Sequence, residues 1–116
     1  MALRECELTR WLCDELRACG AIVIVQQAGV FSQGWPDRLL VTIGWMGFLE
    51  MKGVDGKLTG RQARNLREIH KRQPGHARVV RFGETESGPH RLYDYSMTEW
   101  VEFVTARQLL GLLGAK

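Results

Sequence analysis

The strongest constraint on the fold of this chain is a stretch of nineteen residues, Gly34–Lys52, in which two apolar runs flank a glycine-rich connection. Pro36–Asp37 opens the first run, Arg38–Ile43, whose alternating apolar residues and flanking glycines are typical of a strand. The connection Gly44–Gly47 has the length and glycine content of a hairpin turn. A second strand is predicted over Phe48–Lys52. The stretch therefore predicts a β-hairpin with an aspartate at its entrance.

Three charged side chains of this hairpin are predicted to share one surface. Because successive side chains on a strand point to opposite faces, Glu50 and Lys52 share a face, about 7 Å apart, and Leu49 and Met51 point the other way. Pairing of the two strands brings Asp37 to the same surface. Two carboxylates can hold Mg²⁺ with several waters, and a nearby lysine can orient the attacking water or stabilise charge on a phosphate. The arrangement suits a metal-dependent phosphodiesterase; the alternative is an exposed, solvated strand face.

These residues resemble the PD-(D/E)XK nuclease superfamily and, within it, the VRR-NUC family. The family pattern is G-x-P-D, then E-x-K, then a glutamine in the next helix, and the matching residues are Gly34–Asp37, Glu50–Lys52 and Gln62. The family also has a glutamate near the start of its first helix, a position that Glu5 matches by its separation from a following glycine. The resemblance covers residues 5 to about 82. It implies a restriction-endonuclease-like α/β core, with a central mixed β-sheet flanked by helices.

The resemblance also implies a chemistry and a set of site residues. The expected activity is that of a Mg²⁺- or Mn²⁺-dependent DNA endonuclease, specific for branched or structured DNA such as a Holliday junction. The implied metal ligands are Asp37, Glu50 and the backbone carbonyl of Met51, and the implied catalytic residues are Asp37, Glu50, Lys52, Gln62 and Glu5, the last as an outer metal ligand. Many relatives have a basic residue at the start of the loop that precedes the hairpin, where this chain has Gln26 and Gln27.

Basic residues are concentrated directly after the hairpin. Eight of the sixteen Lys and Arg residues lie within 25 positions there, and the net charge of +3 permits a polyanionic partner. The predicted nucleic-acid-binding residues are Lys57, Arg61, Arg64, Arg67 and Lys71. A charge run by itself is usually a solvated helix face, but beside a metal site it favours a track for phosphates.

Two amphipathic helices are predicted around the hairpin. In the first, Ala2–Cys19, apolar residues recur at a spacing of three and four, and Glu15 is expected at the rim of the buried face with its carboxylate in water. The second begins after Thr59 and runs to about Arg72. Thr59-Gly60-Arg61-Gln62 fits a capping box, in which Gln62 reaches back to the backbone. This structural role and the active-site role are compatible.

The remaining segments are predicted to complete the sheet and extend the chain beyond it. The β-branched run Ala21–Val25 is predicted as a strand covered on both faces, and Ala77–Phe82 as the strand that completes the sheet. Gly83–Pro89 is expected to be a loop. Ser96–Glu99 fits a capping box that starts a long C-terminal helix. That helix either covers the open side of the sheet or forms a dimer contact.

The length of 116 residues bounds the chain to one domain, residues 1–116, with a core at about 5–82 and an extension at 83–116. No apolar run reaches the roughly 18 residues of a membrane helix, and the N-terminus lacks the apolar core of a secretory signal. We therefore expect no membrane contact and a cytoplasmic location, in a bacterial or phage-infected cell.

The sequence as a whole predicts a small endodeoxyribonuclease. Paired incisions across a junction need either two visits or two sites at a fixed separation, and a two-fold homodimer provides the two sites. The apolar residues proposed for the dimer contact are Trp100, Val104, Leu109, Leu112, Leu113, Trp35 and Trp45. The alternative is a non-catalytic nucleic-acid-binding or assembly protein with a degenerate nuclease fold. A third reading is a structural domain without affinity for DNA.

Overall fold

The computed structural model describes residues 3–25 and 34–114, which form an α/β domain around a six-stranded mixed sheet. The strands follow one another across the sheet in chain order: β1 (Ile22–Val25), β2 (Arg38–Thr42), β3 (Trp45–Lys52), β4 (Ala77–Arg81), β5 (His90–Tyr93) and β6 (Trp100–Phe103). Within this sheet β3 and β4 run parallel, and the other neighbours are antiparallel. A parallel pair needs a crossover connection, and α2 (Gly60–Arg72) provides it.

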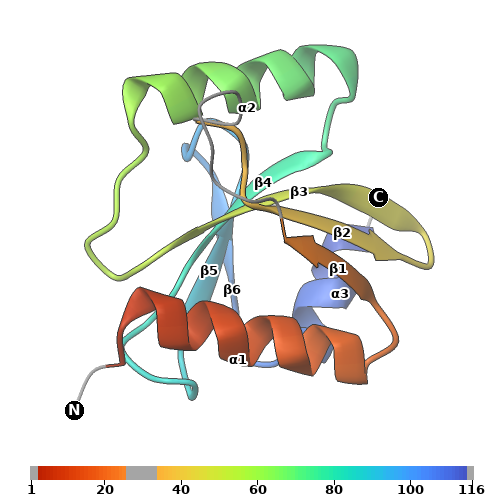
Figure 1. Ribbon diagram of the computed structural model, residues 1–116, viewed down its shortest axis with the longest axis vertical. Helices are drawn as coiled ribbons and strands as arrows, with labels where there is room; N and C mark the ends of the chain where they lie inside the picture. Colours follow the sequence, from red (N-terminus) through yellow and green to blue (C-terminus); the bar gives the residue numbers. More distant parts are fainter. Residues whose placement is uncertain (1–2, 26–33, 115–116) are drawn as a thin grey trace.

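The three described helices lie on both sides of the sheet (Figure 1). Helices α1 (Glu5–Ala18) and α3 (Ala106–Gly114) contact each other and cover one face, and α2 lies over the opposite face against β4. The prediction of a central mixed sheet flanked by helices is confirmed. None of the helices in residues 3–25 and 34–114 has the length and apolar character needed to cross a membrane.

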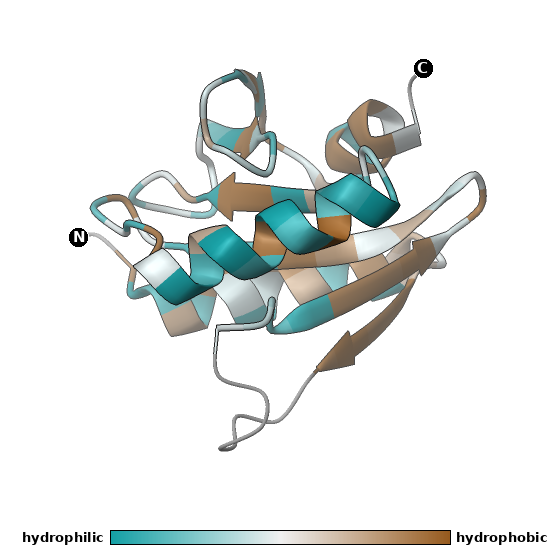
Figure 2. Cartoon of the chain, turned by 90° about the horizontal axis from the view of Figure 1, so that it is seen from above, coloured by the Kyte–Doolittle hydropathy of each residue, from teal (hydrophilic) through white to brown (hydrophobic). Residues whose placement is uncertain are grey.

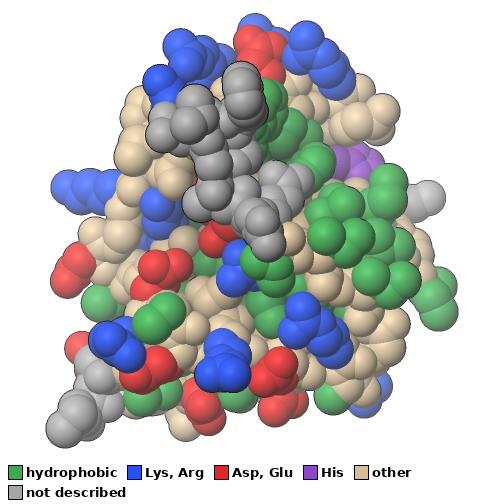
Figure 3. All heavy atoms as spheres, in the orientation of Figure 1, with side chains coloured by type: hydrophobic (Ala, Val, Ile, Leu, Met, Phe, Trp, Pro, Cys, Tyr) green, Lys and Arg blue, Asp and Glu red, His purple; other side chains and the backbone are tan. Residues whose placement is uncertain are grey.

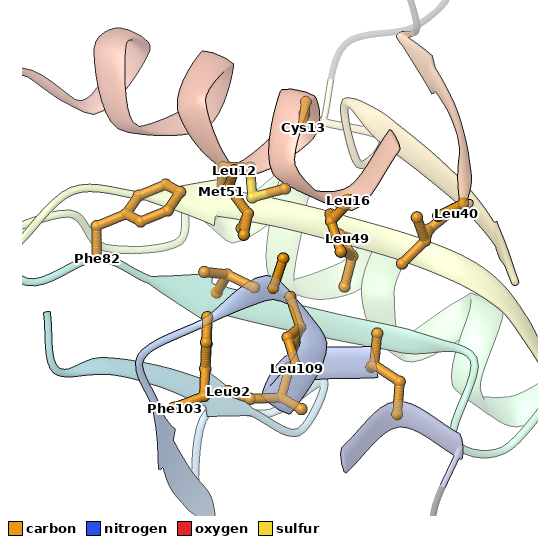
Figure 4. Packing of buried hydrophobic residues seen from close by; sticks show 14 of the residues in the cluster. Leu12, Cys13, Leu16, Leu40, Leu49, Met51, Phe82, Leu92, Phe103 and Leu109 are labelled. Atoms are coloured by element: carbon orange, nitrogen blue, oxygen red, sulfur yellow. The ribbon is translucent and has the colours of Figure 1, made fainter. Parts of the chain in front are cut away.

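The main hydrophobic core lies between the sheet and the pair α1 and α3. Leu12 and Leu16 of α1 point toward Leu49 and Met51 of β3 (Figure 4), and all four side chains are almost fully buried. A smaller cluster around Leu66 lies under α2. Figure 2, which views the molecule from the α2 side, shows a mainly hydrophilic α2 above hydrophobic strands. Alternation along β3 therefore directs its odd-numbered apolar residues into the main core and its even-numbered polar residues toward α2.

The hairpin turn is tighter than the sequence predicts. Thr42 pairs with Trp45, so the turn consists of Ile43 and Gly44, and β3 begins at Trp45 rather than at Phe48. Gly44 has a φ of +91°, a left-handed conformation that glycine adopts without strain. Because Gly44 provides this conformation at the second position of the turn, the chain reverses within two residues and the longer predicted connection is not used.

The first strand is also less covered than predicted. β1 stands at the end of the strand order, and Ile22, Ile24 and Val25 are exposed. The prediction of a strand with both faces covered is wrong, because a continuous β-branched run is found in edge strands as well as in central ones. Gln26 and Gln27 stand where many members of the resembled family have a basic residue, and they lie outside the described residues.

The C-terminal segment corrects two further predictions. The sheet continues beyond Ala77–Phe82 with β5 and β6, and the long helix expected from Ser96 onward is replaced by β6 followed by the shorter α3. The Ser96 hydroxyl and the Thr98 N–H donate to the Asp94 carboxylate. The segment predicted as a capping box therefore forms a turn instead of a helix start. Although burial raises the pKa of Asp94, hydrogen bonds from Glu99, Ser96 and Thr98 lower it to about 2.

Helix α3 covers its own sheet. Its Leu109 and Leu113 are buried in the main core, as is Trp45 of β3, so these side chains are not available for a dimer contact. The helix begins with a different capping box from the predicted one: the Gln108 N–H donates to Thr105 Oγ1, and the Thr105 N–H donates to Gln108 Oε1, both at 3.1 Å.

Leu12→Ala is expected to lower the free energy of unfolding by about 2–5 kcal/mol, because it removes a fully buried side chain and leaves a cavity between α1 and the sheet. Ile43→Ala is the control, since Ile43 is fully exposed at the hairpin turn and its loss should change stability little. Urea denaturation followed by circular dichroism measures both variants. Equal destabilisation by the two changes would contradict the core described here.

Candidate active site

Three of the five residues predicted for catalysis meet on the α2 side of β3. Glu50 and Lys52 point toward α2, and Leu49 and Met51 lie in the main core on the other side, as strand alternation predicts. Gln62, in the first turn of α2, contacts both charged groups: its Nε2 donates to Glu50 Oε1 at 2.7 Å, and its Oε1 accepts from Lys52 Nζ at 2.9 Å. Glu50 is only 4% exposed.

Gln62 also caps its own helix, which confirms the predicted capping box. Its N–H donates to Thr59 Oγ1 at 3.1 Å, and its Oε1 accepts from the Thr59 N–H at 2.9 Å. The side-chain oxygen thus receives two donors, from Thr59 and Lys52. With the oxygen turned to these donors, the amide nitrogen faces Glu50, and the cap thereby orients the amide of Gln62 toward the carboxylate.

Asp37 stands at the entrance of β2, next to this group. One of its oxygens, Oδ2, lies 3.2 Å from Arg38 Nη1, while Oδ1 is buried with no hydrogen-bond partner within the described part of the chain. Gly34, three residues before Asp37, lies close to the Arg61 side chain of α2. Its φ is +80°, and a Cβ added there would lie 2.2 Å from Arg61 Cγ. Only glycine allows α2 to approach this segment so closely.

Burial and mutual repulsion raise the pKa values of the carboxyls at this site. The pKa of Glu50 rises to about 7, first because burial disfavours the carboxylate and then because Asp37 is close. Burial likewise raises the pKa of Asp37, against the effect of Arg38. The pKa of Glu5 is raised by burial and by Asp37. Lys52 acts against the rise in the Glu50 pKa, and Arg38 against that of Asp37, but both pKa values remain raised.

Glu5, in the first turn of α1, lies next to the end of β3. A Cβ at Gly53 would lie 3.3 Å from Glu5 Cβ, so the backbone directly after β3 packs against this glutamate. The residues predicted to be catalytic thus come from three elements, α1, β3 and α2, and from the residue before β2. Glu15, which was predicted to stay at the rim, is exposed.

The donor set fits a divalent cation of the Mg²⁺ type. Within residues 3–25 and 34–114 there is no group of three or more His, Cys, Asp or Glu side chains that could hold a metal ion. However, Mg²⁺ is commonly held by one or two carboxylates with several waters, and Asp37 and Glu50 meet that requirement. The unpartnered Asp37 Oδ1 is a free oxygen ligand. Met51 can contribute only its backbone, because its side chain is buried in the core.

The predicted nucleic-acid-binding residues are only partly near this site. Lys and Arg side chains gather over α2 at the top of the face in Figure 3. At about 100° per residue, Arg64, Arg67 and Lys71 lie on the side of α2 away from Gln62, and Lys71 pairs with Glu68 at 3.7 Å. The contact of Arg61 with Gly34 places it at the edge of the site. Lys57 is exposed in the connection before α2.

Arg38 was not among the predicted site residues, although it forms the ion pair with Asp37. The sequence feature that could have identified Arg38 was its position next to Asp37. Strand alternation argues against a shared surface for adjacent residues, but the long arginine side chain folds back to its neighbour, since Arg38 Nη1 also donates to the Asp37 carbonyl oxygen at 3.0 Å.

Comparison with protein-family models finds no family that matches this sequence, and comparison with curated proteins finds no relative. The α/β fold and the polar group under α2 are therefore the basis for any functional conclusion.

Glu50→Gln is expected to stabilise the metal-free protein at pH 8 relative to the parent chain, by roughly 1–3 kcal/mol, since one pKa unit corresponds to about 1.4 kcal/mol. A pKa raised from 4.5 to about 7 means that the fold favours protonated Glu50. The associated stability is present below about pH 4.5 and is lost as the pH rises through about 7. Thermal unfolding in EDTA at pH 5 and pH 8 measures the difference. A parallel pH dependence of both proteins would contradict the raised pKa.

Proposed function

We propose that this protein is a divalent-metal-dependent endonuclease that hydrolyses phosphodiester bonds in DNA, with a restriction-endonuclease-like core of the VRR-NUC type. One observation carries the proposal: Asp37, Glu50 and Lys52 share one polar surface with Gln62, beside Glu5. The order of elements, α1 to β4, supports it, because a hairpin followed by a helix crossover is what positions these groups. The order agrees with the one expected from the family resemblance.

Each side chain has a distinct task in this proposal. Mg²⁺ or Mn²⁺, when bound, supplies Lewis-acid polarisation of the phosphodiester. Asp37 and Glu50 would hold the cation, with the Met51 carbonyl as a further ligand and Glu5 as an outer one. Gln62 fixes the direction of the Glu50 carboxylate through the 2.7 Å hydrogen bond. The ammonium of Lys52, held by Gln62 Oε1, stabilises the negative charge that grows on the phosphate as water attacks.

The rival function is that of a nucleic-acid-binding or assembly protein that has lost the chemistry. The lack of a third metal-ligating side chain beside Asp37 and Glu50 in the described residues is the observation that favours it. Incubation of the purified protein with duplex, flap and four-way-junction DNA, in Mg²⁺ or Mn²⁺, separates the two functions. Binding without cleavage in either metal would establish the rival.

Asp37→Asn and Glu50→Gln are expected to reduce cleavage about 10²-fold or more, because each removes a charged metal ligand. Lys52→Ala is expected to reduce cleavage by a similar factor while Mn²⁺ binding, measured by titration calorimetry, persists. Glu5→Gln should also slow cleavage. Glu15→Gln is its matched control on the same helix, since Glu15 is exposed. Wild-type rates for Glu50→Gln would show that the site is wrong.

A homodimer is part of the proposal, because two active sites related by a two-fold axis suit a branched, pseudo-symmetric substrate. The exposed apolar side chains that support it are not those of α3. They lie on β1 and just before Asp37, namely Ile22, Ile24, Val25 and Trp35, and near β6, namely Trp100, Val101 and Val104. An edge strand of this apolar character is a surface on which a second chain can pair.

Light scattering at micromolar concentration is expected to give about twice the monomer mass of 13.2 kDa. Ile24→Asp, which places a charge on the apolar edge, should give a monomer. Val54→Asp is the control, because Val54 is equally exposed but follows β3 at a distance from β1. A parent chain that is monomeric and still cuts both strands of a junction in one encounter would contradict the dimer.

A further inference from the structure

A row of three cationic side chains crosses the middle of the sheet. Lys52 of β3 pairs with Arg81 of β4, and Arg81 pairs with Arg91 of β5. Residues at paired positions point to the same face, as do residues two apart on one strand, so the row shares the face of Glu50. Neighbouring strands are about 4.8 Å apart, so the row extends about 10 Å from the candidate active site.

The two arginines of the row are held in place by neutral groups. Arg81 Nη2 donates to the Gly56 carbonyl at 2.7 Å, and the Tyr93 hydroxyl accepts from Arg91 Nη1 at 3.2 Å and from Arg81 Nη1 at 3.5 Å. The guanidinium carbon of Arg91 lies 4.0 Å from the centre of the Trp100 ring. Within the described residues, no carboxylate lies within ion-pair distance of either guanidinium. Both guanidinium groups are therefore positioned without a direct ion pair.

A hollow in the surface lies beside these arginines. It has a volume of about 230 Å³ and is lined by Arg81, Arg91, Val54, Phe82, Gly83, Pro89 and Glu102. The planar guanidinium groups match the oxygens of a phosphate, and arginine keeps its charge at any working pH. Glu102, which pairs with Arg91 across the sheet, adds one negative charge at the far end of the row. An approaching anion is therefore attracted at Arg81 and Arg91 and repelled beyond them.

We propose that Lys52, Arg81 and Arg91, with Trp100 at the far end, form a track for the sugar-phosphate backbone of one DNA strand that leads away from the scissile phosphate. This proposal rests on the nuclease function proposed above. One strand carries one negative charge per nucleotide, so a row of about 10 Å is long enough to contact neighbouring phosphates of the same strand. Trp100, a residue that is 44% exposed, offers the part of its ring that Arg91 leaves uncovered as a surface for an unpaired base.

The position of the row favours it over the outer side of α2 as the path of the cleaved strand. The row begins at Lys52 itself, and it lies on the same face of the sheet as the carboxylates. Arg64, Arg67 and Lys71 lie on the side of α2 away from Gln62 and can contact a second part of a branched substrate. Contacts to phosphate of this kind position the nucleic acid without reading its sequence.

Arg91→Gln tests the track in a binding assay that needs no cleavage. Fluorescence anisotropy with a labelled four-way junction in EDTA is expected to show about 5–10-fold weaker binding at about 0.1 M salt and a salt slope reduced by about 0.9, since one phosphate contact is lost. Arg107→Gln is the matched control, because it removes the same charge from an exposed residue of α3, on the opposite face. It should leave binding within about twofold.

Two further variants separate charge from folding. Arg91→Lys keeps the charge and should retain most of the affinity, whereas Glu102→Gln removes the repelling carboxylate and should tighten binding. Equal effects of Arg91→Gln and Arg107→Gln, or no effect of Glu102→Gln with normal thermal unfolding, would overturn the track.

The outcomes also separate the track from the nuclease function. Weakened binding by Arg91→Gln in a protein that cuts nothing would leave the track standing and reject the nuclease function. Cleavage at the normal rate by Arg91→Gln would reject the track and leave the nuclease function standing. A parent chain that binds no DNA would overturn both proposals.

Discussion

The side-chain amide of Gln62 joins the start of α2 to the polar face of β3, and the geometry of the candidate site depends on this connection. Its oxygen accepts from the Thr59 N–H and from Lys52, and its nitrogen donates to Glu50. A single residue thus satisfies a helix terminus and orients two charged groups. Because the cap is local, it forms whenever α2 forms. The site is consequently assembled by the same interaction that begins the crossover helix.

Glu50 shows how the fold and the chemistry make opposing demands. Packing of Leu49 and Met51 in the core requires Glu50 to face α2, where it is buried and lies close to Asp37. A buried carboxylate with a like charge beside it destabilises a fold, and this explains the pKa of about 7. The pair Asp37 and Glu50 contributes nothing to the core. Such local conflict is expected at sites that serve function rather than stability.

The sequence predicts the local features of the site well. Alternation gives the faces of Glu50 and Lys52, and spacing gives the cap at Gln62, because each depends on neighbours within a few residues. It does not predict that β1 is an edge strand, since strand order depends on contacts between distant segments. Ser96–Glu99 matches a capping box, but the β-branched and aromatic residues that follow form β6 instead. The row through Arg81 and Arg91 was missed for the same reason, because its register requires the paired sheet.

The location of the site follows from the one parallel pair in the described sheet. Glu50 and Lys52 lie at the carboxyl end of β3, and Arg81 at the carboxyl end of β4. In open α/β sheets this end, where the crossover helix begins, is where ligands bind, and the exposed N–H groups of a helix start favour anions. The carboxylates of Asp37 and Glu50 lie beside Lys52 on the β2 and β3 side of this end, and Arg81 lies on its β4 side. A phosphate drawn to Lys52 and Arg81 would therefore also meet two carboxylates, and their repulsion would have to be offset before it could bind there.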